Sequence, residues 1–229
     1  LLRQWRGCAT EKRMTTDAAP PRSLLYVPGS NARALEKAQG LAADLLIIDL
    51  EDAVPADRKI EAREAMRRAV EAGYPGKRIA VRVNATGSWE QEADIAALYG
   101  LALDAVVLPK VDAVADLDPV RVLGVPILAM IETPVAIYAA RDIASDPAVV
   151  GLIAGLNDLA HELKLPDGMD RSAMSVAIQT IVLAARAADV WAFDGVYNAL
   201  DDAAGFAAEA AEGRRLGFDG KTLIHPSQV

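Results

Sequence analysis

Acidic and basic side chains recur in this sequence where short apolar runs end. Glu132 follows the run 126–131, and Asp158 lies shortly after the run 149–154. Two neighbouring carboxylates, completed by water, form the kind of shell that Mg²⁺ accepts. Both residues also suit the start of a helix, where acidic side chains are common caps. The spacing alone leaves two interpretations open, a magnesium site or a pair of helix caps.

Arg82 interrupts another apolar run, and the carboxylates of Asp49, Glu51 and Asp52 crowd the end of a third. A guanidinium at a strand end can grip a carboxylate through two hydrogen bonds and oppose negative charge that develops during a reaction. An arginine that is ion-paired within the fold is the structural alternative. Three carboxylates this close repel one another unless a cation stands nearby, and helix capping or ion pairing accounts for at least one of them. Arg82 and Glu51 are the candidate catalytic residues.

The composition limits which metal ion could bind and in which compartment the protein is expected. The two histidines, His161 and His225, cannot build a multi-histidine site. A metal would therefore need carboxylates, which favours a hard ion such as Mg²⁺. Cys8 is the only cysteine, so no intrachain disulfide can form and nothing indicates an oxidising compartment. We expect a cytoplasmic protein.

Charge and hydropathy exclude two classes of partner. The 229 residues carry 24 Lys and Arg against 32 Asp and Glu, a formal charge of -8. An acidic chain repels a phosphate backbone, so we expect no nucleic acid partner. No run of uncharged apolar residues is long enough to cross a bilayer, so we expect no membrane partner. An anionic substrate would have to be met by locally placed Arg or Lys side chains.

The first 21 residues differ from the remainder of the chain. Several of them are basic, and Pro20 and Pro21 break any helix there. No apolar segment follows the basic residues, so a secretory signal is not expected. We expect a disordered leader over residues 1–21 and one domain over residues 22–229.

From Ser23 onward, short aliphatic runs alternate with longer, alanine-rich amphipathic stretches. Apolar runs without alternation are typical of parallel strands that are covered on both faces. We expect strands at Ser23–Val27, Leu45–Leu50, Arg78–Asn84, Ala105–Pro109, Pro126–Ile131, Val149–Ala154, Val190–Val196 and Lys221–His225. We expect helices at Ala32–Leu41 (with Asn31 as N-cap), Ala56–Glu71, Glu90–Tyr99, Thr133–Ile143, Ala173–Ala188 and Ala203–Leu216.

Strands that alternate with helices predict βαβ units, and eight strands favour a closed (β/α)8 TIM barrel over an open doubly wound sheet. The open sheet would usually carry a glycine-rich phosphate loop after its first strand, which residues 28–31 match poorly. A complete barrel has a helix after its eighth strand, whereas this sequence stops at Val229, so we expect that the C-terminal helix or lid segment is absent. Barrel active sites form at the C-terminal ends of the strands, which is where the charged residues stand.

Seven segments of the sequence resemble, in the same order, those of the citrate lyase β-subunit-like (CoA-ester lyase) family, within the HpcH/HpaI aldolase/citrate lyase superfamily. The resemblance spans residues 22–229, and the set is far more specific than any single motif. The segments are Arg22–Gly29, Asp49–Val54, Val81–Asn84, Leu108–Lys110, Ile131–Thr133, Gly155–Leu159 and Gly220–Pro226. The resemblance implies a magnesium-dependent (β/α)8 lyase that acts on citryl, citramalyl, malyl or related thioesters.

The resemblance also implies roles for individual residues. It assigns the Mg²⁺ ligands to Glu132 and Asp158, and substrate binding to Arg82. The further positions that match CoA or substrate contacts are Tyr26, Arg33, Lys37, Ile224 and His225. Lyases of the family place a catalytic Asp in a C-terminal segment that reaches a neighbouring subunit, so the resemblance implies a homo-oligomer, a trimer or a multiple of one, with shared active sites.

The reaction that we expect is the reversible, Mg²⁺-dependent cleavage of a 3-hydroxyacyl-CoA into acetyl-CoA and a 2-oxo acid. The Gly155-Leu156-Asn157-Asp158 segment departs from the Glu-Asp pairing of many citrate lyase subunits, which favours a stand-alone enzyme. Three alternatives remain: a class II pyruvate-type aldolase without CoA, a citrate lyase β subunit that acts on an acyl-carrier partner, and a non-catalytic binding barrel. An assay with several thioesters separates the first two, and absence of Mg²⁺ binding would favour the third.

Overall fold

The computed structural model describes residues 14–15, 19–166, 168 and 170–229. Eight parallel strands close into a barrel in which each strand pairs with its neighbours in sequence, and β8 returns to β1. The strands are β1 (Ser23–Pro28), β2 (Leu45–Asp49), β3 (Arg78–Arg82), β4 (Ala105–Leu108), β5 (Ile127–Ile131), β6 (Val149–Ala154), β7 (Trp191–Asp194) and β8 (Gly220–Leu223). The predicted (β/α)8 barrel is confirmed, and the open doubly wound sheet is excluded.

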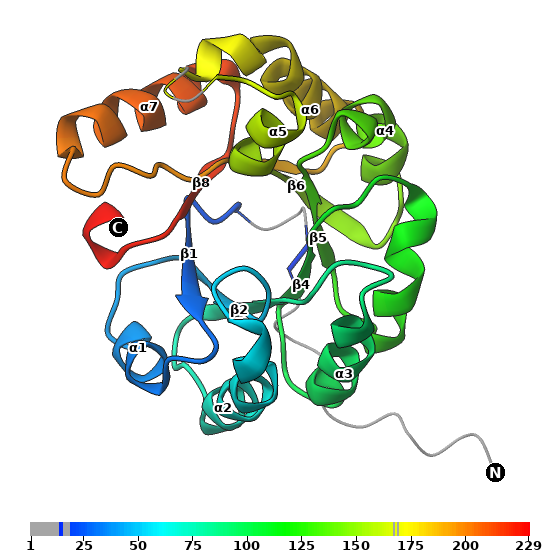
Figure 1. Ribbon diagram of the computed structural model, residues 1–229, viewed down its shortest axis with the longest axis vertical. Helices are drawn as coiled ribbons and strands as arrows, with labels where there is room; N and C mark the ends of the chain where they lie inside the picture. Colours follow the sequence, from blue (N-terminus) through cyan, green and yellow to red (C-terminus); the bar gives the residue numbers. More distant parts are fainter. Residues whose placement is uncertain (1–13, 16–18, 167, 169) are drawn as a thin grey trace.

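An outer ring of helices surrounds the strands (Figure 1). The α-helices are α1 (Ala32–Ala38), α2 (Lys59–Ala72), α3 (Trp89–Leu98), α4 (Pro134–Ala144), α5 (Leu156–Glu162), α6 (Ser175–Ala187) and α7 (Ala203–Leu216). Short 3₁₀ segments are η1 (Ala56–Arg58), η2 (Val114–Leu123), η3 (Arg171–Met174) and η4 (Pro226–Gln228). All six expected helices are present, and the predicted cap is confirmed because Asn31 Oδ1 accepts a hydrogen bond from the Ala34 amide.

Two elements that follow the strands β4 and β6 were not predicted from the sequence. The connection between β4 and β5 is the 3₁₀ segment η2, which contains Pro119, a residue that interrupts α-helical hydrogen bonding. Helix α5 has only 7 residues and starts directly after β6. In Figure 1 it lies nearer the centre of the barrel than the outer helices α4, α6 and α7.

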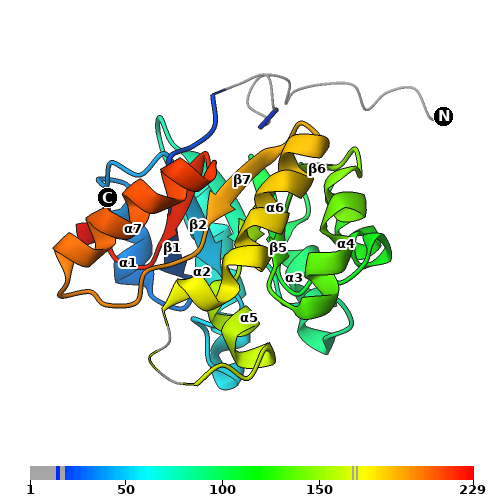
Figure 2. The same cartoon turned by 90° about the horizontal axis from the view of Figure 1, so that it is seen from above.

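The barrel has two apolar layers. Leucine and isoleucine side chains of the strands pack outward against the helices, and a second cluster fills the interior of the barrel. Met14, which lies in the segment expected to be a leader, is 3% exposed and belongs to the interior cluster. Most of that segment lies outside the described residues, and Figure 2 shows the described residues directly before β1, in dark blue, leading from the top of the view into this strand.

The strand register brings the catalytic candidates to one end of the barrel. Pro28 pairs with Asp49, and Asp49 pairs with Arg82, so these three strand ends are level. Ile131 pairs with Ala154, which places the residues after β5 and β6 side by side. Among the described residues, no helix combines the length and the apolar character that are needed to cross a bilayer.

Candidate active site

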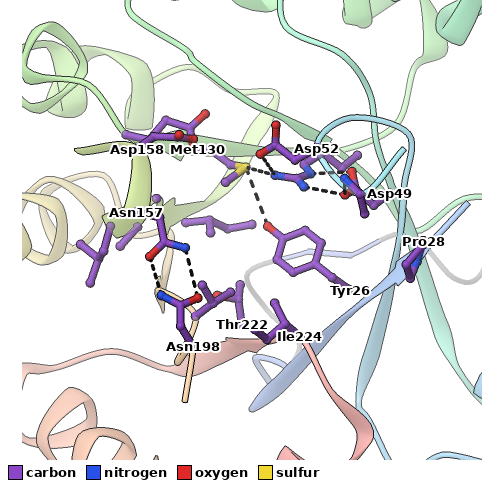
Figure 3. A pocket seen from close by; sticks show the side chains of 18 residues that line it. Tyr26, Pro28, Asp49, Asp52, Met130, Asn157, Asp158, Asn198, Thr222 and Ile224 are labelled. Carbon is purple, nitrogen blue, oxygen red and sulfur yellow. Dashed lines mark hydrogen bonds and ion pairs between the residues drawn. The ribbon is translucent and has the colours of Figure 1, made fainter. Parts of the chain in front are cut away.

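A cavity of about 350 Å³ opens at the C-terminal ends of the strands. Its walls come from the ends of β1, β2, β3, β5, β6 and β8 and from the loops after β6 and β7. Figure 3 shows Asp49, Asp52 and Asp158 on one side of the cavity, and Asn157, Asn198, Thr222 and Ile224 across from them. Tyr26, Arg82, Glu132, Asp158 and Ile224 all line it, so the structure brings five of the predicted site residues together.

Glu132 and Asp158 are the two predicted metal ligands, and the structure tests the alternative that each of them caps a helix. Thr133, not Glu132, caps α4, because its side chain accepts a hydrogen bond from the Ala136 amide at 3.0 Å. Gly155 is the N-cap of α5, and Asp158 sits in the first turn without a capping hydrogen bond. The helix-cap interpretation is therefore wrong for both carboxylates.

Glu132 is 1% exposed, and its Oε1 accepts a hydrogen bond of 2.7 Å from the backbone amide of Lys110. Lys110 adopts a left-handed conformation with φ of 52°, which is unusual for a residue other than glycine and points this amide at the carboxylate. In the described part of the chain, neither Glu132 nor Asp158 forms an ion pair. Burial, followed by the charge of Asp158, raises the pKa of Glu132 to about 8.

This pair fits a hard divalent cation. Two neighbouring carboxylates, one of them buried without a counter-ion, are what Mg²⁺ takes from a protein, because the ion keeps several waters. Within the described residues, no group of three or more His, Cys, Asp or Glu side chains converges, which argues against a fully protein-built metal cage. Glu132 and Asp158 would hold the ion, and water and substrate would complete its shell.

Arg82 is held in place by Asp49. Its Nε and Nη2 donate hydrogen bonds of 2.7 and 2.6 Å to the two oxygens of Asp49, and the side chain is almost fully buried. Burial lowers the pKa of Arg82, but the hydrogen bonds and charge of Asp49 outweigh burial and hold the pKa above its ordinary value. The third nitrogen, Nη1, lies 3.0 Å from Glu51 Oε2 and 3.9 Å from the sulfur of Met130.

Glu51 lies beside Arg82 and is 8% exposed, although it is not among the residues that line the cavity. Its Oε2 is 3.0 Å from Arg82 Nη1, yet it accepts no hydrogen bond, because the two groups are misaligned. Burial raises the pKa of Glu51 to about 7 against the opposing effect of Arg82. The structure therefore places Glu51 next to the site without exposing its carboxyl to the cavity.

Tyr26 stacks under Arg82, with the guanidinium carbon 4.7 Å from the centre of the ring. Its hydroxyl donates toward the sulfur of Met130 at 3.8 Å. Burial raises the pKa of Tyr26, so the phenol stays protonated and remains a donor at any ordinary pH. Sequence reasoning missed Met130, although Leu128, Met130 and Glu132 alternate along β5 and the residue after it, which indicates that they share a face.

Two further polar contacts shape the site and were missed from the sequence. Lys59 Nζ donates hydrogen bonds to the backbone oxygens of Leu50 and Glu51 and to Asn84 Oδ1, which fixes the loop that carries Glu51. Asn157 and Asn198 exchange two side-chain hydrogen bonds of 2.8 and 3.3 Å between helix α5 and the loop after β7, as Figure 3 shows. No sequence spacing reveals either contact, because each joins separate elements.

Three predicted substrate-binding residues lie outside the cavity. Arg33 and Lys37 are exposed on α1, one helical turn apart. The His225 ring accepts a hydrogen bond from the Ser227 amide and caps η4. Their roles stay predictions.

Residues 22–226 match the profile of the family described as HpcH/HpaI aldolase/citrate lyase. The chain is 47% identical over 219 residues to a (3S)-malyl-CoA thioesterase of Cereibacter sphaeroides, covering 94% of this chain and 77% of that protein. A citrate lyase β subunit of Mycobacterium tuberculosis, solved with oxaloacetate and magnesium, shares the structure with a TM-score of 0.83 at 34% identity, covering 94% of this chain and 96% of that one.

A second structure of a Mycobacterium tuberculosis protein, CitE, contains magnesium, acetoacetate and coenzyme A, and has a TM-score of 0.82 at 34% identity over 93% of this chain and 79% of that one. These relatives confirm the predicted Mg²⁺ cofactor and the CoA-ester lyase class at the level of the family. The chain belongs to the HpcH/HpaI aldolase/citrate lyase family.

Proposed function

We propose that this protein is a Mg²⁺-dependent enzyme that reversibly cleaves the carbon–carbon bond of a 3-hydroxyacyl-CoA, such as malyl-CoA or citramalyl-CoA, into acetyl-CoA and a 2-oxo acid. One observation carries the proposal. Glu132 and Asp158 share a cavity with Arg82 and have no cation of their own among the described residues. A bound Mg²⁺ would supply the charge that eases loss of the proton from the substrate hydroxyl.

The residues of the chain contribute binding and electrostatics. Arg82, fixed by Asp49, opposes the negative charge that develops on the thioester oxygen as the carbon–carbon bond breaks. Because the Asp49 contact already orients the guanidinium, little reorganisation is needed during the reaction. Apolar side chains that also line the cavity, among them Ile153 and Val196, reduce the access of water to it.

A thioesterase is the second candidate, and one observation favours it, since the 47% identical relative is a (3S)-malyl-CoA thioesterase. The two reactions give different products from the same substrate. Lyase cleavage of malyl-CoA releases acetyl-CoA and glyoxylate without a free thiol, whereas hydrolysis releases malate and a free CoA thiol. The ratio of 2-oxo acid to thiol therefore assigns the reaction.

The test is an assay of the purified protein with malyl-CoA, citramalyl-CoA and citryl thioesters, with Mg²⁺ and with EDTA. We expect metal-dependent release of a 2-oxo acid. Equal amounts of malate and free thiol, without 2-oxo acid, would instead establish the thioesterase. Turnover of a CoA-free oxo-acid aldol would support the class II aldolase, and activity only with an acyl-carrier thioester would support the citrate lyase subunit.

The binding of the CoA tail has its own test. Arg33 and Lys37 are exposed cations on one face of α1, next to β1, and suit the phosphates of CoA in an acidic protein. Arg33→Ala with Lys37→Ala is expected to raise KM for the CoA thioester and to leave KM for a pantetheine thioester, which lacks the nucleotide, unchanged. An equal change with both substrates would reject the assignment.

Assembly as a cytoplasmic homo-oligomer, a trimer or a multiple of one with shared sites, is part of the proposal. The family resemblance supports it, and so do the large apolar side chains exposed on the outer helices, such as Trp89 at 91% and Tyr138 at 92%. Light scattering of the purified protein measures the assembly. A fully active monomer would exclude shared sites.

A further inference from the structure

Met130 occupies an unusual position at the end of β5. Its side chain is 5% exposed and lines the cavity, and its sulfur faces two donors at once. The Tyr26 hydroxyl lies 3.8 Å from this sulfur, and Arg82 Nη1 lies 3.9 Å from it. Figure 3 shows both dashed contacts meeting at the Met130 sulfur.

The two donors are only weakly satisfied there. A thioether sulfur is a weak acceptor, whereas buried donors in proteins are normally paired with strong ones. Among the described residues, the Met130 sulfur is the only hydrogen-bond partner of the Tyr26 hydroxyl. Arg82 Nη1 otherwise faces carboxylates of the loop after β2, at 3.0 Å for Glu51 and 3.6 Å for Asp52, without a well-aligned hydrogen bond to Glu51 Oε2.

The positions of both donor atoms are set by contacts that do not involve Met130. Asp49 holds the guanidinium through Nε and Nη2, and the ring of Tyr26 lies 4.7 Å below it. The guanidinium cannot turn away without breaking its Asp49 contacts, and the Tyr26 oxygen cannot move away without breaking the ring contact. The two donors are thus preorganised toward one point, and a thioether occupies that point.

We infer that the Tyr26 hydroxyl and Arg82 Nη1 bind one oxygen atom of the acyl substrate. Met130, as a weak acceptor, leaves both donors available to this oxygen and so determines how tightly it is held. The inference rests on the proposed function for the identity of the substrate. A carboxylate or a polarised carbonyl oxygen is a much stronger acceptor than sulfur, so the substrate displaces the weak contacts at little cost. An oxygen acceptor in place of the sulfur would compete with the substrate instead.

Two substitutions change affinity in opposite directions. Met130→Gln has similar length and brings an amide oxygen that accepts from both donors, so ligand binding is expected to weaken by about tenfold or more. Met130→Leu keeps the volume and removes the acceptor. The Tyr26 hydroxyl then loses its only partner among the described residues, and Arg82 Nη1 keeps only its ion pairs with Glu51 and Asp52, so ligand binding is expected to tighten by roughly two- to fivefold while the melting temperature without ligand falls.

The experiment measures binding by calorimetry, separately from turnover. Wild type, Met130→Gln and Met130→Leu are titrated in Mg²⁺ with pyruvate or oxaloacetate, and in a second arm with acetyl-CoA. The arm that responds identifies the oxygen, which belongs to the 2-oxo acid in the first case and to the thioester in the second. Met174→Gln is the matched control, because Met174 is 7% exposed and does not line this cavity. It reports the general effect of burying an amide, and its affinities should match those of wild type.

Opposite shifts of the two Met130 variants in at least one arm support the inference. Shifts of the same sign, or Met130→Gln affinities equal to wild type in both arms, overturn it, because a side chain that only fills space would give those results. A wild-type protein that binds neither ligand also overturns it. A wild-type protein that binds a ligand with opposite shifts in the variants, but cleaves no CoA thioester, upholds the inference and rejects the proposed function.

Discussion

Glu132 and Asp194 are both 1% exposed carboxylates at the same end of the barrel, yet their surroundings are opposite. Asp194, the last residue of β7, accepts hydrogen bonds of 2.9 Å from both terminal nitrogens of Arg171 and one of 3.1 Å from Lys221. Glu132, directly after β5, has one backbone donor and no ion pair in the described part of the chain. A buried carboxylate that is already paired has its partners within the fold, whereas a buried carboxylate without a counter-ion is free to bind a cation.

The largest effect expected from this difference is on catalysis. Glu132→Gln removes the charge that would hold Mg²⁺. Loss of a residue that only supports a metal ligand costs up to about a hundredfold in activity, so loss of a direct ligand should lower turnover by at least that factor. The free energy of unfolding without metal should stay the same or increase, because no ion pair is lost. Asp158→Asn should behave alike. Assays and Mg²⁺ calorimetry measure the effect, and full activity in either variant would remove these residues from the metal site.

The reciprocal change at β7 should act on stability. Asp194→Asn leaves Arg171 and Lys221 without their shared carboxylate, and breaking a buried pair in this way costs about 3–5 kcal/mol. Denaturant unfolding measures the change, and Mg²⁺ affinity should remain as in wild type. A loss below about 1 kcal/mol would show that Glu209, which also pairs with Lys221, takes over the role of Asp194.

Arg82 lies between the two cases, because it is paired through Asp49 and still presents Nη1. Arg82→Lys keeps the charge but cannot make the two-point contact, so activity should fall about tenfold or more with a smaller loss of stability. Steady-state kinetics and thermal unfolding on the same preparation separate the two effects. Wild-type turnover in Arg82→Lys would mean that Arg82 is purely structural.

The smallest effect is a dependence on pH. Burial raises the pKa of Glu132 in the folded protein from 4.5 to about 8, so the folded state binds this proton more tightly than the unfolded state does. The resulting stabilisation is complete below the unfolded pKa and disappears as pH rises through about 8. Metal-free stability should thus decline over this range, while Mg²⁺ affinity rises because the ligand must be deprotonated. Both slopes should flatten in Glu132→Gln, and a steep slope in that variant would assign the titration to another group, with Glu51 the first to examine.

The sequence predicted the barrel because its strands are short apolar runs covered on both faces, a pattern that needs no knowledge of the partner strand. The position of Glu132, Asp158 and Arg82 at the cavity could be predicted for the same reason, since each lies at or shortly after a strand end. Met130 and the Asn157–Asn198 pair could not, because their contacts depend on which side chains meet across the cavity. The sequence also could not separate Glu132 from Asp194, since pairing with Arg171 requires η3 to fold over β7.

Gly155 leaves the space that the Glu132 side chain occupies. Its φ is -90°, a conformation that other residues adopt freely, so backbone freedom does not explain a glycine here. A methyl group at this position would overlap Cβ and Oε2 of Glu132. Any larger side chain at residue 155 would therefore displace the Glu132 carboxylate. When all twenty amino acids are tried at this position, only glycine should keep activity, although residue 155 has no side chain that could take part in the reaction.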